Sequence, residues 1–125
     1  MKAHGALYNQ AARDRQIAAA IADGVARWNP RKDVVMVGLA GSVMLGVFRD
    51  AGFPVAAEAF ADRGYEKDGS LRARSLPGSL LEDPGAAGRQ ALGIVQHRRI
   101  VAVDGTPLTV QAETLCVHGD TPGAP

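Results

Sequence analysis

The fold follows most directly from the stretch Phe53-Pro54-Val55-Ala56-Ala57-Glu58-Ala59-Phe60-Ala61-Asp62-Arg63-Gly64-Tyr65. An apolar run leads here into two acids, a base and a phenol. Alternate side chains of a β-strand point to the same face, so Glu58, Phe60 and Asp62 are expected on one face and small alanines on the other. Neighbouring carboxylates can shift each other's pKa, and an adjacent guanidinium can hold one of them ionised. The pattern indicates an acid/base or ligand-binding site, with a strand end carrying solvated charges as the alternative.

Composition restricts the class of protein. The chain has 125 residues, of which 46% are hydrophobic, and this predicts a single packed domain over residues 1–125. A net charge of +1 gives no electrostatic reason to expect nucleic acid or an anionic membrane as a partner. No apolar run approaches the roughly 20 residues that cross a bilayer, and no signal-peptide pattern is present. Together with a single cysteine, which cannot form an internal disulfide, these features predict a cytoplasmic protein.

The first half of the chain predicts alternating strands and helices. Residues 1–4 resemble the end of a strand, and residues 5–9 resemble a polar turn. Residues 34–37 are a short apolar run typical of a buried parallel strand, a helix is expected over residues 42–51, and a strand over residues 55–60. Between the first two strands, a helix is expected over residues 14–28, with Asp14 as N-cap and with helical spacing of Ile17, Ile21, Val25 and Trp28.

The second half begins with a long irregular segment. Residues 63–82 have no sustained period and are typical of a functional or disordered loop. Asp83-Pro84 predicts a helix start, and the helix is expected to continue to about residue 97 through Ala87, Ala91, Ile94 and Val95. Residues 100–103 and 108–110 flank an Asp104-Gly105 turn and predict a hairpin. Residues 114–117 resemble a further buried strand.

This order of elements predicts an α/β fold with a mostly parallel sheet. A polar cluster directly follows each predicted strand of that sheet. Because α/β folds place their sites at the C-terminal ends of parallel strands, the sequence predicts an active-site face there. The candidate catalytic residues are His4, Glu58, Asp62, Arg63, His118 and Asp120.

Several of these candidates also have a simpler structural explanation. His4 could cap a turn, and Asp62 with Arg63 could form only a salt bridge. His118 is the more persuasive histidine, because a nearby carboxylate such as that of Asp120 can fix its tautomer.

Three other features favour structure over function. His97 follows a helix, where a cation suits the negative helix end, and Cys116 lies in an apolar run typical of a core thiol. Gly38-Leu39-Ala40-Gly41-Ser42 lacks the spacing of known phosphate-binding loops, so a tight turn is expected.

Three blocks of the sequence closely resemble signatures of the LamB/YcsF family. They are Lys2-Ala3-His4-Gly5-Ala6-Leu7-Tyr8-Asn9, Glu58-Ala59-Phe60-Ala61-Asp62-Arg63-Gly64-Tyr65 and Cys116-Val117-His118-Gly119-Asp120-Thr121-Pro122-Gly123-Ala124. The resemblance covers essentially the whole chain. It implies a partial (β/α) barrel of the glycoside hydrolase/deacetylase type, of which this chain would be the C-terminal half. A half-barrel exposes sheet edges and apolar faces, so we expect association with a partner or a homo-oligomer.

The resemblance also implies an activity: ATP-dependent hydrolytic opening of 5-oxoproline to L-glutamate, carried out with two partner subunits. In outline, Glu58 or Asp62 would be the base, Arg63 the charge stabiliser, and His4 or His118 the proton shuttle. A deacetylase-like variant would use a divalent metal held by His4, His118 and a carboxylate. The alternatives are a non-catalytic binding or scaffold subunit of the same fold, or an inactive truncated fragment.

Overall fold

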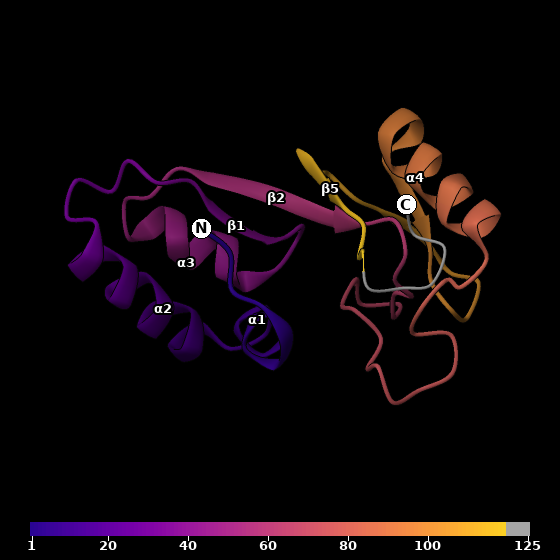
Figure 1. Ribbon diagram of the computed structural model, residues 1–125, viewed down its shortest axis with the longest axis horizontal. Helices are drawn as coiled ribbons and strands as arrows, with labels where there is room; N and C mark the ends of the chain where they lie inside the picture. The colour runs from indigo at the N-terminus through magenta and orange to yellow at the C-terminus, as the bar shows by residue number, and fades with distance from the viewer. Residues whose placement is uncertain (120–125) are drawn as a thin grey trace. The chain divides into compact units, whose positions relative to one another are not determined.

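The computed structural model describes residues 1–119 and confirms an α/β fold with a parallel sheet (Figure 1). The chain divides into two compact units, Met1–Glu58 (unit 1) and Ala59–Pro125 (unit 2). Strand β2 (Val55–Phe60) runs through the division and lies between β1 (Met36–Leu39) and β5 (Thr114–Cys116) in a three-stranded sheet. The three strands predicted to be neighbours are therefore confirmed as neighbours. Membership of a barrel and of a single domain stay predictions.

Unit 1 packs one helix against a parallel strand pair and a second helix against the first. Strands β1 and β2 run parallel, with Met36 opposite Val55 and Leu39 opposite Glu58. Helix α3 (Val43–Asp50) packs on β1, and helix α2 (Arg15–Trp28) packs on α3. Lys2 forms a parallel bridge with Val37, so the first residues extend this sheet, as the sequence predicts.

Strand β1 begins two residues later than predicted and includes Gly38, which the sequence assigned to a turn. A Cβ atom at Gly38 would lie 2.7 Å from the sulfur of Met44, so the glycine leaves room for this side chain of α3 against the strand. Val35, expected inside the strand, is instead exposed. The strand therefore lies where the apolar run predicts it, but its bounds are shifted by two residues.

The polar turn predicted for residues 5–9 is wrong, because these residues form most of helix α1 (Gly5–Ala11). His4 occupies the N-cap position but its side chain makes no capping hydrogen bond. The helix is stabilised instead by burying Tyr8 and Ala11, which lie three residues apart on one face. Its solvent-facing polar residues produced the turn-like pattern in the sequence.

Helix α2 has the predicted N-cap, since the Asp14 carboxylate accepts hydrogen bonds from the backbone N–H groups of Gln16 and Ile17. The expectation that Trp28 continues the apolar face is wrong, because this side chain is 68% exposed. The buried face of the helix consists of Ala18, Ala22 and Val25. Small alanines allow close approach to α3, which a tryptophan on that face would prevent.

Unit 2 contains helix α4 and a hairpin. Helix α4 (Pro84–His97) begins at the predicted Asp83 N-cap, whose carboxylate accepts from two backbone N–H groups. Strands β3 (Arg99–Val101) and β4 (Pro107–Thr109) pair antiparallel, which confirms the hairpin. Ile94 of α4 is buried, but Val95 is 69% exposed and does not belong to the inner face of the helix.

The segment 63–82 is folded rather than loose. Arg63 forms an antiparallel bridge with Leu80, and Tyr65 forms one with Leu71. A Cβ atom at Gly64 would clash with a backbone carbonyl oxygen, so two turns of this segment approach as closely as backbone allows. The 63–82 segment is therefore a packed part of unit 2 that directly follows β2.

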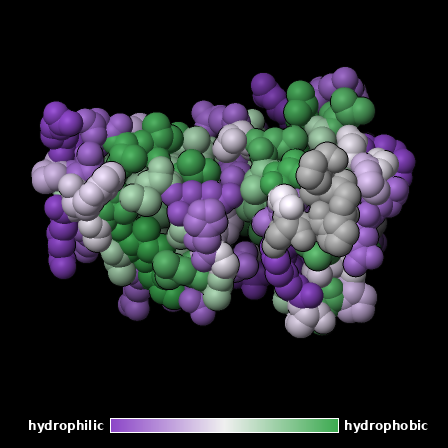
Figure 2. Space-filling view, in the orientation of Figure 1, coloured by the Kyte–Doolittle hydropathy of each residue, from purple (hydrophilic) through white to green (hydrophobic). Residues whose placement is uncertain are grey.

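Apolar side chains also reach the surface. Figure 2 shows hydrophobic residues in green among polar ones on the face that it draws. Within residues 1–119, no helix has the length and apolar character needed to span a membrane. Association with a partner or a second copy stays a prediction. Large exposed apolar side chains include Trp28 and Val35 in unit 1 and Leu92, Val95 and Val117 in unit 2.

Candidate active site

Asp62 lies two residues beyond strand β2 in unit 2 and is only 4% exposed. The main chain here is held firmly, because the carbonyl of Asp62 accepts a hydrogen bond from the N–H of Leu81. The carboxylate accepts a hydrogen bond of 2.8 Å at Oδ2 from the backbone N–H of His118. A buried carboxylate of this kind needs such donors to offset its lost hydration.

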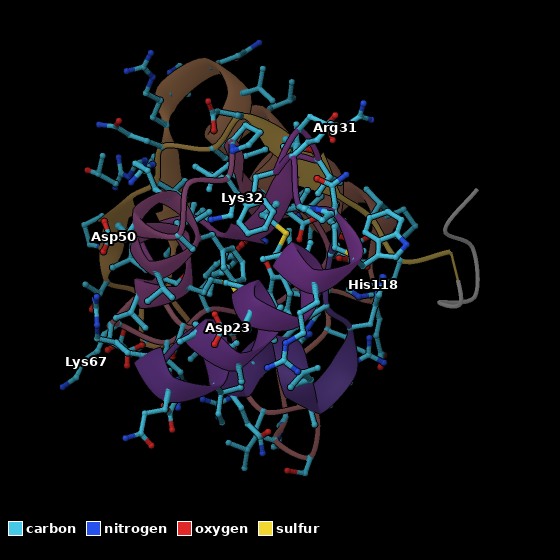
Figure 3. All side chains as sticks on the ribbon, turned by 90° about the vertical axis from the view of Figure 1, so that its left-hand side faces the viewer. Asp23, Arg31, Lys32, Asp50, Lys67 and His118 are labelled. Atoms are coloured by element: carbon cyan, nitrogen blue, oxygen red, sulfur yellow. The ribbon has the colours of Figure 1, made fainter. Side chains whose placement is uncertain are left out.

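His118 provides a second contact to the same carboxylate. Its Nδ1 atom lies 2.9 Å from Oδ2 and 3.2 Å from Oδ1 of Asp62. The imidazole ring also stacks on Phe60, with ring centroids 5.6 Å apart and an interplanar angle of 16°. His118 is labelled in Figure 3, and its side chain is 23% exposed, against 6% for that of Asp62. The ring is therefore held on two sides while part of it still reaches solvent.

The chemistry of this pair follows from its geometry. An ionised carboxylate can only accept hydrogen bonds, so Nδ1 of a neutral His118 must carry the proton that it shares with Asp62. The lone pair then lies on Nε2, where it can accept a proton. The sequence paired His118 with Asp120, which lies outside the described residues. Among the described residues its carboxylate partner is Asp62.

Arg63 is also buried, being 3% exposed, but its contacts are with backbone. Its Nε donates to the carbonyl of Ser79 at 2.9 Å, and its Nη2 donates to the carbonyl of Arg72 at 2.7 Å. Burial lowers the pKa of Arg63, as does Arg74, while Asp62 opposes this change. The guanidinium therefore stabilises the 63–82 segment by hydrogen bonds to its backbone. It does not hold the Asp62 carboxylate by hydrogen bonds.

Glu58 occupies a different setting, in unit 1. It is 5% exposed, and both carboxylate oxygens are engaged. Lys2 Nζ lies 2.6 Å from Oε1, and the Tyr8 hydroxyl donates to Oε2 at 3.0 Å. The Lys2 ammonium also lies 5.6 Å from the centroid of the Tyr8 ring. This cluster ties the first residues of the chain and helix α1 to strand β2.

His4 is exposed at the start of α1 in unit 1, whereas His118 belongs to unit 2. The six candidates are divided between the two units, and their convergence on one active-site face stays a prediction. No group of three or more His, Cys, Asp or Glu side chains within residues 1–119 is arranged to hold a metal ion. A metal held by His4 and His118 likewise stays a prediction.

The tight turn predicted for residues 38–42 is confirmed only after Leu39, because Gly38 and Leu39 belong to β1. The N–H groups of Ala40, Ser42 and Val43 donate to the carbonyls of Glu58, Leu39 and Ala12, respectively. The Ser42 hydroxyl also donates to the carbonyl of Leu39. These donors are used within the protein, so the turn does not present them to a phosphate.

Three residues with important contacts were missed in the sequence. Lys2 and Tyr8 hold Glu58, and the available signal was an acid within a buried-type strand. Gln90 of α4 donates from Nε2 to the carbonyls of Phe60, Ala61 and Arg63. Its signal was a polar residue within an otherwise apolar helical stripe.

Comparison with known proteins identifies the family. The model of the LamB/YcsF family matches residues 1–125. The A subunit of 5-oxoprolinase from Chloroflexus aggregans is 52% identical over 99% of this chain and 48% of its own length, and that from Limosilactobacillus fermentum is 45% identical over 99% and 49%. The crystal structure of a lactam utilization protein from Thermus thermophilus is 44% identical, with a TM-score of 0.83 over 97% of this chain and 48% of that chain. The chain thus spans about half the length of the curated relatives it matches. It belongs to the LamB/YcsF family.

Proposed function

We propose that the protein carrying this chain is the A subunit of an ATP-dependent 5-oxoprolinase. The reaction is hydrolytic opening of the cyclic amide 5-oxoproline to L-glutamate, performed with two other 5-oxoprolinase subunits. Two relatives that match 99% of the chain are named as the A subunit of 5-oxoprolinase, which supports this assignment. The observation that carries the chemistry is the buried Asp62 carboxylate bound to Nδ1 of the partly exposed His118.

Opening a lactam requires one proton to be removed and one to be delivered. Nε2 of His118 takes a proton from the attacking water as the new carbon–oxygen bond forms, and Asp62 stabilises the resulting imidazolium at Nδ1. The same proton then passes to the ring nitrogen as the carbon–nitrogen bond breaks. In this scheme His118 is the catalytic residue and Asp62 positions it. General acid–base catalysis of this type contributes about 10²–10⁴-fold to the rate.

ATP enters the proposal through the family resemblance. An unactivated amide is a poor electrophile, and transfer of the γ-phosphoryl group to the lactam oxygen makes its carbon easier to attack. ADP would leave in that transfer, one water would open the ring to an acyl phosphate, and a second water would hydrolyse the acyl phosphate to the carboxylate and inorganic phosphate. In this proposal Arg63 stabilises the 63–82 segment beside Asp62, because its hydrogen bonds go to two backbone carbonyls of that segment.

The test is replacement of His118 in the full-length protein assembled with its partner subunits. His118→Gln is expected to lower the kcat of ATP-dependent glutamate release by about 10²–10⁴-fold. The matched control is His97→Gln, which changes an exposed histidine at the end of α4 and is expected to leave kcat unchanged. Wild-type turnover in His118→Gln would refute the catalytic assignment and favour a binding or scaffold role for this protein.

A further inference from the structure

Gln90 occupies a position on helix α4 where an apolar residue is expected. The inner stripe of the helix is formed by Ala87, Ala91 and Ile94, and Gln90 lies three residues after the first and four before the last. Residues at these spacings share one helix face. A polar side chain on a packed face is costly unless its hydrogen-bonding groups find partners.

The partners of Gln90 all belong to one short segment. Its Nε2 lies 2.9 Å from the carbonyl oxygen of Phe60, 3.1 Å from that of Ala61 and 2.9 Å from that of Arg63. Three acceptors around one amide nitrogen fix the orientation of the amide, because Oε1 in the same place would face three oxygens. The two N–H groups of Gln90 are thus shared among the carbonyls on both sides of Asp62.

We call the three hydrogen bonds from Gln90 Nε2 to the carbonyls of Phe60, Ala61 and Arg63 the clamp. Other contacts of the same segment show how the clamp is linked to Asp62. The N–H of Phe60 donates to the Tyr65 hydroxyl, the N–H of Ala61 donates to the carbonyl of Cys116, and the carbonyl of Asp62 accepts from Leu81. A side-chain donor to the carbonyls of Phe60, Ala61 and Arg63 joins these contacts. Gln90 supplies it at the turn from which the Asp62 carboxylate reaches His118.

We propose that Gln90 is a positioning residue that holds the turn at residues 60–63 and thereby sets the contact between Asp62 and His118. Its effect on catalysis rests on the proposed function. Its effect on the Asp62–His118 contact does not. Loss of Gln90 Nε2 removes its hydrogen bonds to three carbonyls around Asp62 and lets the turn relax, and a misplacement of about 1 Å can cost 10²-fold in rate.

The test uses Gln90→Met, which keeps the length of the side chain and removes the donor, in the full-length protein with its partner subunits. We expect kcat per folded molecule to fall about 10- to 10²-fold while KM changes only a few-fold. In proton NMR spectra, the hydrogen-bonded Nδ1–H of His118 should move upfield or exchange faster. Gln90→Asn keeps a donor too short to reach all three carbonyls, and should give an intermediate effect. The matched control is Gln96→Met, at an exposed position of the same helix.

The outcomes separate this inference from the proposed function. Wild-type kcat and an unchanged Nδ1–H signal in Gln90→Met would overturn the positioning role, while His118→Gln would still decide the catalytic role of His118. Normal turnover in His118→Gln would overturn the catalytic role of His118, and absence of ATP-dependent glutamate release by the wild-type assembly would overturn the proposed function. In both cases the Nδ1–H signal in Gln90→Met would still test the contact between Asp62 and His118. Loss of stability without a change in kcat per folded molecule or in the signal also contradicts positioning.

Discussion

Two buried carboxylates near the end of strand β2 differ in what holds them. Both oxygens of Glu58, in unit 1, are engaged by Lys2 and Tyr8. Asp62, in unit 2, is bound by the backbone and the ring of His118. Lysine and tyrosine exchange protons far from neutral pH, whereas histidine does so near pH 7. Burial and charge alone therefore do not distinguish the two carboxylates, but the identity of the partner does, and it supports the role proposed for Asp62.

The largest expected effects, on turnover and on stability, come from replacing each carboxylate by the corresponding amide. Asp62→Asn should lower kcat by about 10²–10⁴-fold, because an amide no longer stabilises an imidazolium at Nδ1 of His118. Glu58→Gln should instead lower the free energy of unfolding by about 1–3 kcal/mol, through loss of the Lys2 contact, and change turnover per folded molecule only a few-fold. Steady-state assays and denaturant unfolding of the full-length protein measure both quantities.

The comparison fails if the two variants exchange their effects. A Glu58→Gln variant with native stability and little turnover would give unit 1 the catalytic carboxylate. A destabilised Asp62→Asn variant with normal turnover per folded molecule would make the Asp62–His118 contact structural.

A smaller effect on activity, but a clear one on stability, is expected at Arg63. Arg63→Met keeps most of the apolar stem but removes charged donors from the carbonyls of Ser79 and Arg72, and should cost about 3 kcal/mol. The matched control is Arg99→Met, at an exposed position of β3, where a change within about 0.5 kcal/mol is expected. Equal stability of the two variants in denaturant unfolding would show that Arg63 does not hold the 63–82 segment.

The smallest effect concerns Asp104, an exposed carboxylate whose partners are local. The backbone N–H of Thr106, followed by its side chain, lowers the pKa of Asp104 from its ordinary value of 3.8. A lowered folded-state pKa means that the stabilising contribution is complete above the unfolded value and is lost as pH falls through the folded value. The amide signal of Thr106 should therefore titrate with a midpoint below 3.8. Asp104→Asn should abolish this transition, and a midpoint at or above the ordinary value would contradict the assignment.

The parts of the fold that sequence predicted well depend on local contacts. Asp14 and Asp83 cap helices through N–H groups two and three residues away, and the Asp104-Gly105 turn sets the hairpin. Such patterns are complete within a few residues. Helix α1 was missed because its stability comes from burying Tyr8, whose hydroxyl contacts Glu58 fifty residues away.

The candidate site shows the same division. Asp62 and His118 were both predicted from their places after strands, but their pairing spans 56 residues and could not be read from spacing. From the sequence, Arg63 was expected to contact Asp62, and Asp120 was expected to contact His118. Gln90 was missed because its role depends on carbonyls that carry no residue-specific signal. The sequence therefore indicated which residues could carry chemistry, but not which residues far apart in the chain contact one another.

The tautomer of His118 tests the central claim most directly. Nitrogen-15 NMR of the full-length protein distinguishes a ring protonated at Nδ1 from one protonated at Nε2. If Asp62 orients His118 as a base, the neutral ring should be protonated at Nδ1, with Nε2 unprotonated, and Asp62→Asn should reduce this preference. A neutral ring protonated at Nε2 in the native protein, unaffected by Asp62→Asn, would contradict the account.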